Sequence, residues 1–397
     1  MKRFPALFTA FVLIFQCLTA AGCASLFKKE YISVTEHIGE TPDAPGDSAV
    51  EVSGFNDLRN AVTRFVVGHS ETGRVEFRNY DGNVNTDLAK ACWQVKSETA
   101  YGAYAVDYIS YDVNHIVSYY AADVYINYRH TREELSKLTT AENTGIVRDH
   151  LKNCLEKADT VILIQTGNRL ITTDGIKEMI LDVYYGDPLV SPVLPDADVM
   201  AYPERGIQRI FETRLDYSRG REKLAEMKTR LFDTVSETAA SISTEEPVIA
   251  AMEACLLLSG ICEYVADGSI QPGPAGIDGE TINLSTAYGA LIENYANGEG
   301  FAMAYKALCD ALSVECRVVS GRMDKAPHVW NIIRIDDDYY HVDVSQSAKF
   351  GMDGFFLNND SDMWGRYLWD TEKNPECEGS FSYRDIIVWA DLDEAAA

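Results

Sequence analysis

The stretch Gly298-Glu-Gly-Phe-Ala-Met-Ala-Tyr-Lys-Ala-Leu308 decides the fold of the C-terminal part of this 397-residue chain. Its apolar side chains at 301, 304, 305 and 308, continued by Leu312, repeat with the period of an α-helix. We therefore expect an amphipathic helix that begins near Gly298 and buries its apolar face.

Two further segments follow this helix, Pro327-His-Val-Trp-Asn331 and Tyr340-His-Val-Asp-Val-Ser345. Short apolar runs bounded by turn residues are typical of strands. The pattern predicts strands over 316–320, 329–335 and 339–344, with Asp336-Asp-Asp338 as the turn between the last two. A helix followed by a hairpin of strands indicates an α+β domain.

The order of these segments, preceded by Thr286-Ala-Tyr-Gly-Ala-Leu291, resembles the transglutaminase-like superfamily over roughly residues 245–390. Gly354-Phe-Phe-Leu-Asn358 and the aromatic run 364–369 also look like bacterial members of that family. The resemblance implies a papain-like fold, in which a central helix packs on an antiparallel sheet. It also implies a cysteine at the start of the helix, with a histidine and an aspartate on adjacent strands.

Carried over residue by residue, the resemblance makes His328 the general base and Asp343 the residue that orients it. A carboxylate on one ring nitrogen fixes the tautomer that presents the other nitrogen to a thiol. The cysteine position falls on Gly298, which has no thiol, hydroxyl or amine. Cys309 lies 11 residues further along the same helix, about 16 Å away at 1.5 Å per residue, so it cannot replace that thiol.

Three readings of the function stay open. We expect a non-catalytic module that binds peptide, cell-envelope material or a protein partner, with His328 and Asp343 kept as a buried hydrogen-bonded pair. His341 shares the strand face of Asp343 and is expected either to neighbour the pair or to be exposed. The second reading is an active cysteine peptidase or transamidase that uses another thiol, or a hydrolase in which His328 and Asp343 activate water. The third is a structural or adaptor lipoprotein.

The first residues have the features of an export signal. Lys2 and Arg3 precede an apolar run and a small-residue stretch that ends in Ala-Ala-Gly-Cys23, as in a secretory signal. This ending resembles a bacterial lipobox, which implies cleavage after residue 22 and lipidation of Cys23. Residues 23–50, rich in Pro, Gly and Asp, are then expected to be a flexible tether, and the protein to be extracytoplasmic and membrane-anchored.

Charge excludes one class of partner. The chain has 35 basic and 61 acidic residues, a net charge of −26, which falls to −28 when Lys2 and Arg3 leave with the signal peptide. So acidic a field repels phosphate backbones, and we expect no nucleic-acid partner.

Cysteine spacing gives no sign of a metal. Seven cysteines remain beyond Cys17 and Cys23, without CxxC spacing or a His/Cys cluster. We therefore predict no metal site and no cofactor, and most of these thiols should be buried small apolar groups.

Residues 51–243 resemble two diverged copies of one α+β unit, ahead of the transglutaminase-like domain at 244–397. Tyr128-Arg-His-Thr-Arg-Glu-Glu-Leu-Ser-Lys-Leu138 matches Tyr217-Ser-Arg-Gly-Arg-Glu-Lys-Leu-Ala-Glu-Met227 at an offset of 89 residues. Each follows a strand-like segment, at 117–128 and 207–217. A helix, a short strand and a helix are expected before each, at 58–67, 75–77 and 86–95, and at 144–155, 160–164 and 176–184.

Overall fold

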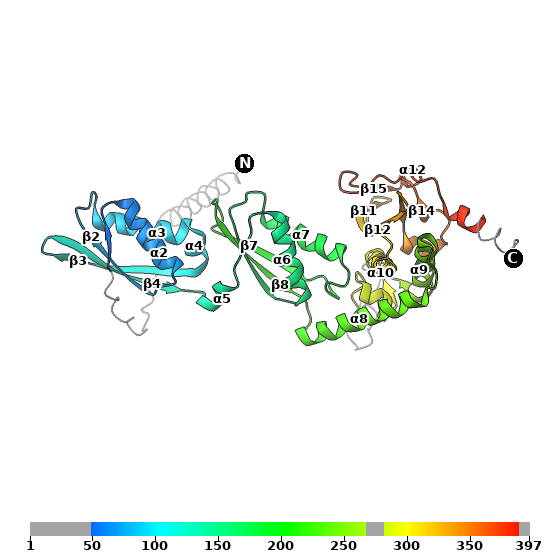
Figure 1. Ribbon diagram of the computed structural model, residues 1–397, viewed down its shortest axis with the longest axis horizontal. Helices are drawn as coiled ribbons and strands as arrows, with labels where there is room; N and C mark the ends of the chain where they lie inside the picture. Colours follow the sequence, from blue (N-terminus) through cyan, green and yellow to red (C-terminus); the bar gives the residue numbers. More distant parts are fainter. Residues whose placement is uncertain (1–48, 267–281, 389–397) are drawn as a thin grey trace, which may run out of the picture. The chain divides into compact units, whose positions relative to one another are not determined.

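The computed structural model describes residues 49–266 and 282–388. The predicted signal peptide, Cys23 and nearly all of the predicted tether lie outside this range, as does most of the Gly/Pro-rich loop that ends at Gly279. The described chain contains both helices and sheets, which confirms the mixed α+β class (Figure 1). Within the described residues, no helix combines the length and the apolar character needed to span a membrane.

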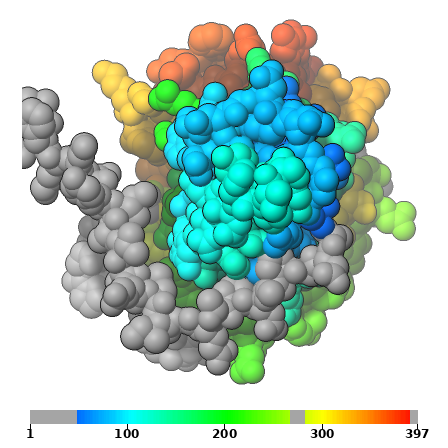
Figure 2. Space-filling view, turned by 90° about the vertical axis from the view of Figure 1, so that its left-hand side faces the viewer, coloured from blue at the N-terminus to red at the C-terminus, as the bar shows by residue number. Residues whose placement is uncertain are grey.

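The N-terminal unit, residues 50–136, is a four-stranded sheet with order β1-β2-β4-β3, covered by helices. Its blue and cyan atoms face the viewer in Figure 2. Helices α2 and α3 pack on each other and enclose an apolar core with the sheet. Its elements are β1 (Val50–Val52), α2 (Phe55–Val67), β2 (Thr72–Phe77), α3 (Val84–Glu98), α4 (Ala100–Ala105), β3 (Val106–Ile116), β4 (Tyr119–Tyr128) and α5 (Arg132–Ser136).

The middle unit, residues 139–241, is also a four-stranded sheet with helices, in the order β5-β6-β8-β7. Its long last helix is followed by the C-terminal domain, and one apolar core contains residues of both. Its elements are β5 (Thr139–Thr140), α6 (Thr144–Glu156), β6 (Val161–Thr166), α7 (Thr173–Gly186), β7 (Asp196–Tyr202), β8 (Arg209–Asp216) and α8 (Arg221–Ser241).

The two units share one topology. In each, the first strand pairs parallel with the second, and the last strand lies between the second and the third, antiparallel to both. Helices α2 and α3 begin at residues 55 and 84, and α6 and α7 begin at 144 and 173. Strands β2 and β6 begin at 72 and 161. Every one of these starts is separated from its counterpart by 89 residues.

Contacts of single residues follow the same spacing. His69 has a φ of 50° and Ala158 a φ of 51°, both just after the first helix of their unit. The Tyr128 hydroxyl donates to the carbonyl oxygen of Ser70 at 3.0 Å, and the Tyr217 hydroxyl to that of Asp159 at 3.3 Å. Each tyrosine thus ties the end of the last strand to the loop that follows the first helix.

The C-terminal domain, residues 247–388, is built around a five-stranded antiparallel sheet with order β14-β13-β12-β11-β15. A two-stranded parallel pair, β9 and β10, lies apart from it. The elements are α9 (Pro247–Ile261), β9 (Glu263–Tyr264), the π-helical turn η1 (Gly289–Glu293), β10 (Tyr295–Ala296), α10 (Gly298–Ala311), β11 (Cys316–Met323), β12 (Ala326–Ile335), β13 (Asp338–Val342), α11 (Val344–Phe350), β14 (Phe356–Asn358), α12 (Asp360–Met363) and β15 (Tyr367–Trp369).

Helix α10 is the centre of this domain. It contacts α8, α9, α11, β11 and β12, and its residues from Phe301 to Cys309 are all buried. The apolar periodicity predicted burial of one face only. The helix is buried on every side because small residues, Ala302, Ala304 and Ala307, let its neighbours approach closely, and because Lys306 pairs with Asp310 at 2.5 Å.

Three strand predictions need correction. The strand expected over 117–128 begins only at Tyr119, since Val117, with a φ of 34°, turns the chain between β3 and β4. Strands β3 and β7 were not predicted at all. The strand expected over 339–344 ends at Val342, because Asp343 caps helix α11 through a hydrogen bond from the Gln346 N–H.

The matched tyrosines give a first prediction. Tyr128→Phe and Tyr217→Phe each remove a hydroxyl that donates to a backbone carbonyl, and each should lower the free energy of unfolding of its own unit by about 1 kcal/mol. Hydrogen exchange read peptide by peptide would locate the loss. Tyr120→Phe, at an exposed position of β4, is the control that should change nothing. Loss of protection spread equally over both units would contradict this local role.

Candidate functional site

The start of α10 lies against a histidine. Asn297 caps the helix, since its Oδ1 accepts a hydrogen bond from the Gly300 N–H at 3.0 Å. Gly298, the first residue of the helix, is buried. A Cβ atom placed on Gly298 would lie 3.2 Å from both Nδ1 and Cε1 of His328. A side chain at position 298 would therefore point directly at the imidazole, which packs close to the glycine backbone.

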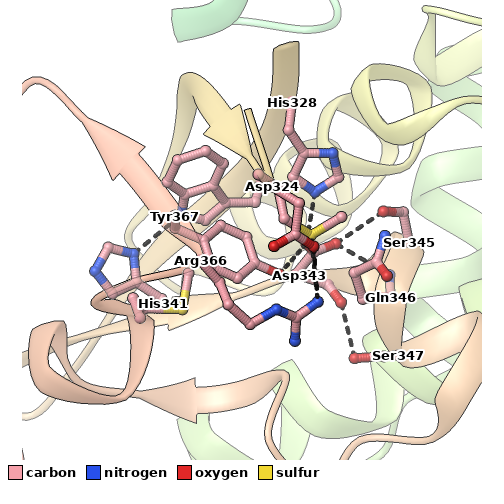
Figure 3. A network of polar contacts seen from close by, with 12 residues as sticks. Asp324, His328, His341, Asp343, Ser345, Gln346, Ser347, Arg366 and Tyr367 are labelled. Carbon is pink, nitrogen blue, oxygen red and sulfur yellow. Dashed lines mark hydrogen bonds and ion pairs between the residues drawn. The ribbon is translucent and has the colours of Figure 1, made fainter. Parts of the chain in front are cut away.

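The other ring nitrogen of His328 contacts Asp343. His328 is on β12 and Asp343 is at the start of α11, and Nε2 lies 2.6 Å from Oδ2 (Figure 3). The structure thus brings residues 298, 328 and 343 together, with the imidazole of His328 between Gly298 and Asp343. Asp343 occupies a helix cap rather than a strand, which is the one difference from the expected placement.

Asp343 is 2% exposed and its carboxylate is surrounded by donors. Oδ1 accepts from the Ser345 hydroxyl at 2.8 Å and from the Gln346 N–H at 3.0 Å. Oδ2 accepts from the Tyr367 hydroxyl at 2.9 Å besides His328 (Figure 3). Because Asp343 Oδ2 accepts from Nε2, a neutral His328 presents the lone pair of Nδ1 toward Gly298.

His341 forms a separate pair, not a contact with Asp343. The Trp330 Nε1–H donates to Nδ1 of His341 at 3.0 Å, and Nε2 lies 2.9 Å from Oδ1 of Asp360. His341 is 1% exposed, so the alternative of an exposed side chain is wrong, and its hydrogen-bond partners are Trp330 and Asp360. Asp343 lies beyond the end of β13, at the N-cap of α11, so the alternation of the strand does not extend to it.

His341, Asp360 and Cys377 bring ligand atoms within 4.8 Å of one another, a spacing that a metal ion could use. The tautomer does not fit such an ion. Indole nitrogen is only a donor, so Nδ1 of His341 must be an acceptor and the proton of the neutral ring is on Nε2. Metal-bound histidines have the opposite arrangement, with the free nitrogen donating.

The thiols of the described chain are far from reactive. All seven are buried. Burial raises the pKa of Cys154 to about 11 and that of Cys255 to about 12. Cys316, at the start of β11, accepts a hydrogen bond from Asn331 rather than from His328. Among the described residues, no cysteine sulfur is a hydrogen-bond partner of His328.

Some contacts of the site come from residues that sequence reasoning missed. Tyr185, in the last turn of α7, donates its hydroxyl to Oε1 of Glu299 at 2.8 Å. The middle unit thus reaches the first turn of α10, next to Gly298. Tyr367 lies in the aromatic run that carried part of the family resemblance, but nothing in its spacing indicated a contact with Asp343.

Comparisons with known proteins give weak similarities. A solved structure of a TGase is 12% identical over 53% of this chain and 59% of that chain, with a TM-score of 0.26. A candidate cysteine protease from Cytophaga hutchinsonii is 13% identical over 38% of this chain and 62% of its own, with a TM-score of 0.23. The chain thus spans about three-fifths of each structure. At such TM-scores neither similarity bears on function, and no family model or curated protein matches the chain.

Burial of His341 predicts a pH effect on stability. Desolvation lowers the pKa of His341 below its usual 6.5, although Asp360 opposes the shift. As the pH falls, the unfolded chain therefore takes up this proton before the folded chain does. The contribution of His341 to the free energy of unfolding is complete above about pH 6.5 and is lost as the pH falls below it. His341→Gln should flatten the fall in unfolding free energy between about pH 7 and pH 5, measured by urea unfolding.

Two other histidines limit this effect. Burial also lowers the pKa of His69 and His150, so part of the slope should remain in the variant. His115→Gln, at an exposed position of β3, is the matched control and should keep the slope of the natural chain. An equal slope in His341→Gln and the natural chain would show that His341 does not titrate as its burial requires.

Proposed function

We propose that residues 244–397 form a transglutaminase-like module in which Gly298 occupies the place of the nucleophile, and that this module binds its target without transforming it. The observation that carries the proposal is the direction of position 298. A side chain there would meet Nδ1 of His328 at 3.2 Å, and the residue present has none.

The surroundings of the pair favour a structural role for it. The Asp343 carboxylate already accepts four hydrogen bonds, and the His328 side chain is only 8% exposed. A buried carboxylate that joins β12, α11 and β15 stabilises the packing of these elements without any reaction. His328 and Asp343 can therefore stabilise the fold even though residue 298 has no nucleophilic side chain.

The target class follows from where the chain is expected to be. We propose export and lipidation at Cys23, which would put the module outside the cytoplasmic membrane, where peptide, cell-envelope material and protein partners are available. The net charge of −26 disfavours polyanions such as nucleic acids. For the same reason, we propose that the ligand is neutral or cationic.

A second candidate assigns the interaction to the N-terminal and middle units, with the C-terminal domain as support. The spacing of 89 residues between the starts of five pairs of elements and the equivalent Tyr128 and Tyr217 contacts support a duplicated unit. Duplicated modules commonly supply extended binding surfaces. In this reading the chain is an adaptor lipoprotein.

An enzymatic function is the remaining alternative. It requires either a native thiol that reaches His328 or a water molecule held at Nδ1. The first route is disfavoured because the seven thiols are buried, and burial raises the pKa of most of them. The second route needs space beside Nδ1, and the imidazole lies close against Gly298 instead.

Restoring the thiol tests the proposal. In Gly298→Cys, the helix start and Nδ1 of His328 should lower the thiol pKa, so iodoacetamide at neutral pH should alkylate it about tenfold or more faster than an ordinary thiol. The imidazole must move by a few tenths of an ångström to admit the Cβ. Peptide mass spectrometry would measure the rate at residue 298 alone.

Matched controls make this outcome informative. Gly260→Cys places a thiol in open space near the C-terminal end of α9, and it should react at the ordinary rate. The double variant Gly298→Cys/His328→Gln should lose most of the gain. Equal rates at 298 and 260 would contradict the geometry, and hydrolysis of peptides or glutamine amides by the natural chain, lost in His328→Gln, would overturn the non-catalytic assignment.

Membrane attachment has its own test. Cys23→Ser should move the exported protein from the membrane fraction to the soluble extracytoplasmic fraction, because two acyl chains are what holds it stably on a membrane. Cys17→Ser, in the part of the signal that is removed, should leave the distribution unchanged. Persistent membrane association of Cys23→Ser would exclude lipidation at this residue as the anchor.

A further inference from the structure

A cavity of about 690 Å³ opens beside α12 and β15. It is lined by residues 359–361, Trp364, Trp369, Thr371 and residues 374–378, so it includes neither His328 nor Gly298. Its volume lies within the range of small-molecule and side-chain binding pockets. The cavity is therefore a second candidate site in the C-terminal domain, separate from the one already described.

Buried side chains orient the carboxylate of Asp360, which lines the cavity. Trp330 donates to Nδ1 of His341, and Nε2 of His341 lies 2.9 Å from Oδ1 of Asp360. Trp330 and His341 are each 1% exposed, so neither can rearrange easily. Asp360 is partly exposed and lines the cavity. A buried chain of two hydrogen bonds thus orients a carboxylate that a ligand can reach.

The walls add two indole rings. Trp369 is fixed by T-shaped contacts with His341 at 4.7 Å and Trp330 at 6.2 Å between ring centroids. Trp364 contacts Trp369 at 6.4 Å but is itself 70% exposed. Exposing so large an apolar ring costs free energy unless a ligand covers it. Trp364 and Trp369 therefore offer aromatic surface at the cavity.

The charges of the lining are of one sign. Among the described residues that line the cavity, Asp360, Glu376 and Glu378 are acidic and none is Lys or Arg. An indole face attracts a cation through its quadrupole, and a nearby carboxylate adds direct charge attraction. Neutral sugars also stack on tryptophan, but three carboxylates would not improve such stacking.

We propose that this cavity binds an organic cation, namely the ammonium group of an alkylamine such as a peptide lysine side chain. The alkyl part lies against Trp364 and Trp369, and the ammonium group is directed to Asp360 and the two glutamates. This assignment goes beyond the proposed function, since it does not depend on whether residues 298, 328 and 343 form an inactive site.

The test uses the full chain and a defined probe, Nα-acetyl-lysine N-methylamide. Its neutral counterpart is Nα-acetyl-norleucine N-methylamide, which keeps the alkyl chain and lacks the ammonium group. NMR of the indole N–H groups should show the lysine probe shifting the signals of Trp364 and Trp369 while the exposed Trp93, on α3, stays unchanged as an internal reference. The norleucine probe should produce no comparable shift.

Variants identify which contacts bind the probe. Trp364→Ala should weaken binding about two- to fivefold, the effect of losing one exposed cation–π contact. Glu376→Gln/Glu378→Gln should weaken it further and reduce its dependence on salt. Trp93→Ala and Glu372→Gln, an exposed acidic residue outside the lining, are the matched controls and should bind as the natural chain does.

Three other results would overturn the proposal that the cavity binds an ammonium group. Equal shifts by the lysine and norleucine probes would mean that the cavity recognises only the alkyl chain. Shifts by an N-acetylglucosamine trisaccharide in place of the lysine probe would make it a sugar site. Binding of the lysine probe without any shift of Trp364 or Trp369 would assign the interaction to another site, whereas failure of the Gly298→Cys experiment alone would leave this inference intact.

Discussion

The hydrogen bond between His328 and Asp343 is the contact on which the C-terminal domain depends. The carboxylate accepts from four donors that come from β12, from α11 and from Tyr367 on β15. Removing one partner of such a buried pair leaves the others with donors that water cannot satisfy, which is strongly destabilising. This constraint fixes the position of His328, and through it the close approach of the imidazole to the start of α10.

That approach explains why glycine fits at position 298. The backbone of Gly298 lies so near the ring that an added Cβ would be 3.2 Å from two of its atoms. A cysteine there would need His328 to move slightly, against the 2.6 Å bond to Asp343. The glycine and the tightly held histidine are thus mutually consistent.

Much of this arrangement could be predicted from the sequence, because it depends on local patterns. The helical period placed the start of α10 at Gly298, and the strand patterns placed His328 within reach of an aspartate. The offset of 89 residues, visible in one short match, recurs at the starts of five pairs of elements, β1 and β5, α2 and α6, β2 and β6, α3 and α7, and α5 and α8. Such features are encoded by residues close together in the chain.

The parts that the sequence did not predict depend on contacts between distant segments. Strand β3 is an exception, because Ile109-Ser-Tyr-Asp-Val-Asn114 alternates apolar and polar residues and therefore carries a local strand signal. The capping role of Asp343 had a local signal, since Asp is a preferred N-cap residue and polar residues follow it, but the apolar run before it suggested a longer strand. The Tyr185 and Tyr367 contacts had no local signal.

The cavity beside Trp364 illustrates the same limit in physical terms. Its two indoles and two glutamates lie within one short stretch of sequence, yet the orientation of Asp360 depends on His341 and Trp330, which belong to other strands. The buried Trp330 connects the two sites, since its ring lies 6.0 Å from that of His328 and its N–H holds His341. A single buried side chain therefore contacts both the His328 ring and the histidine that orients Asp360 at the candidate amine site.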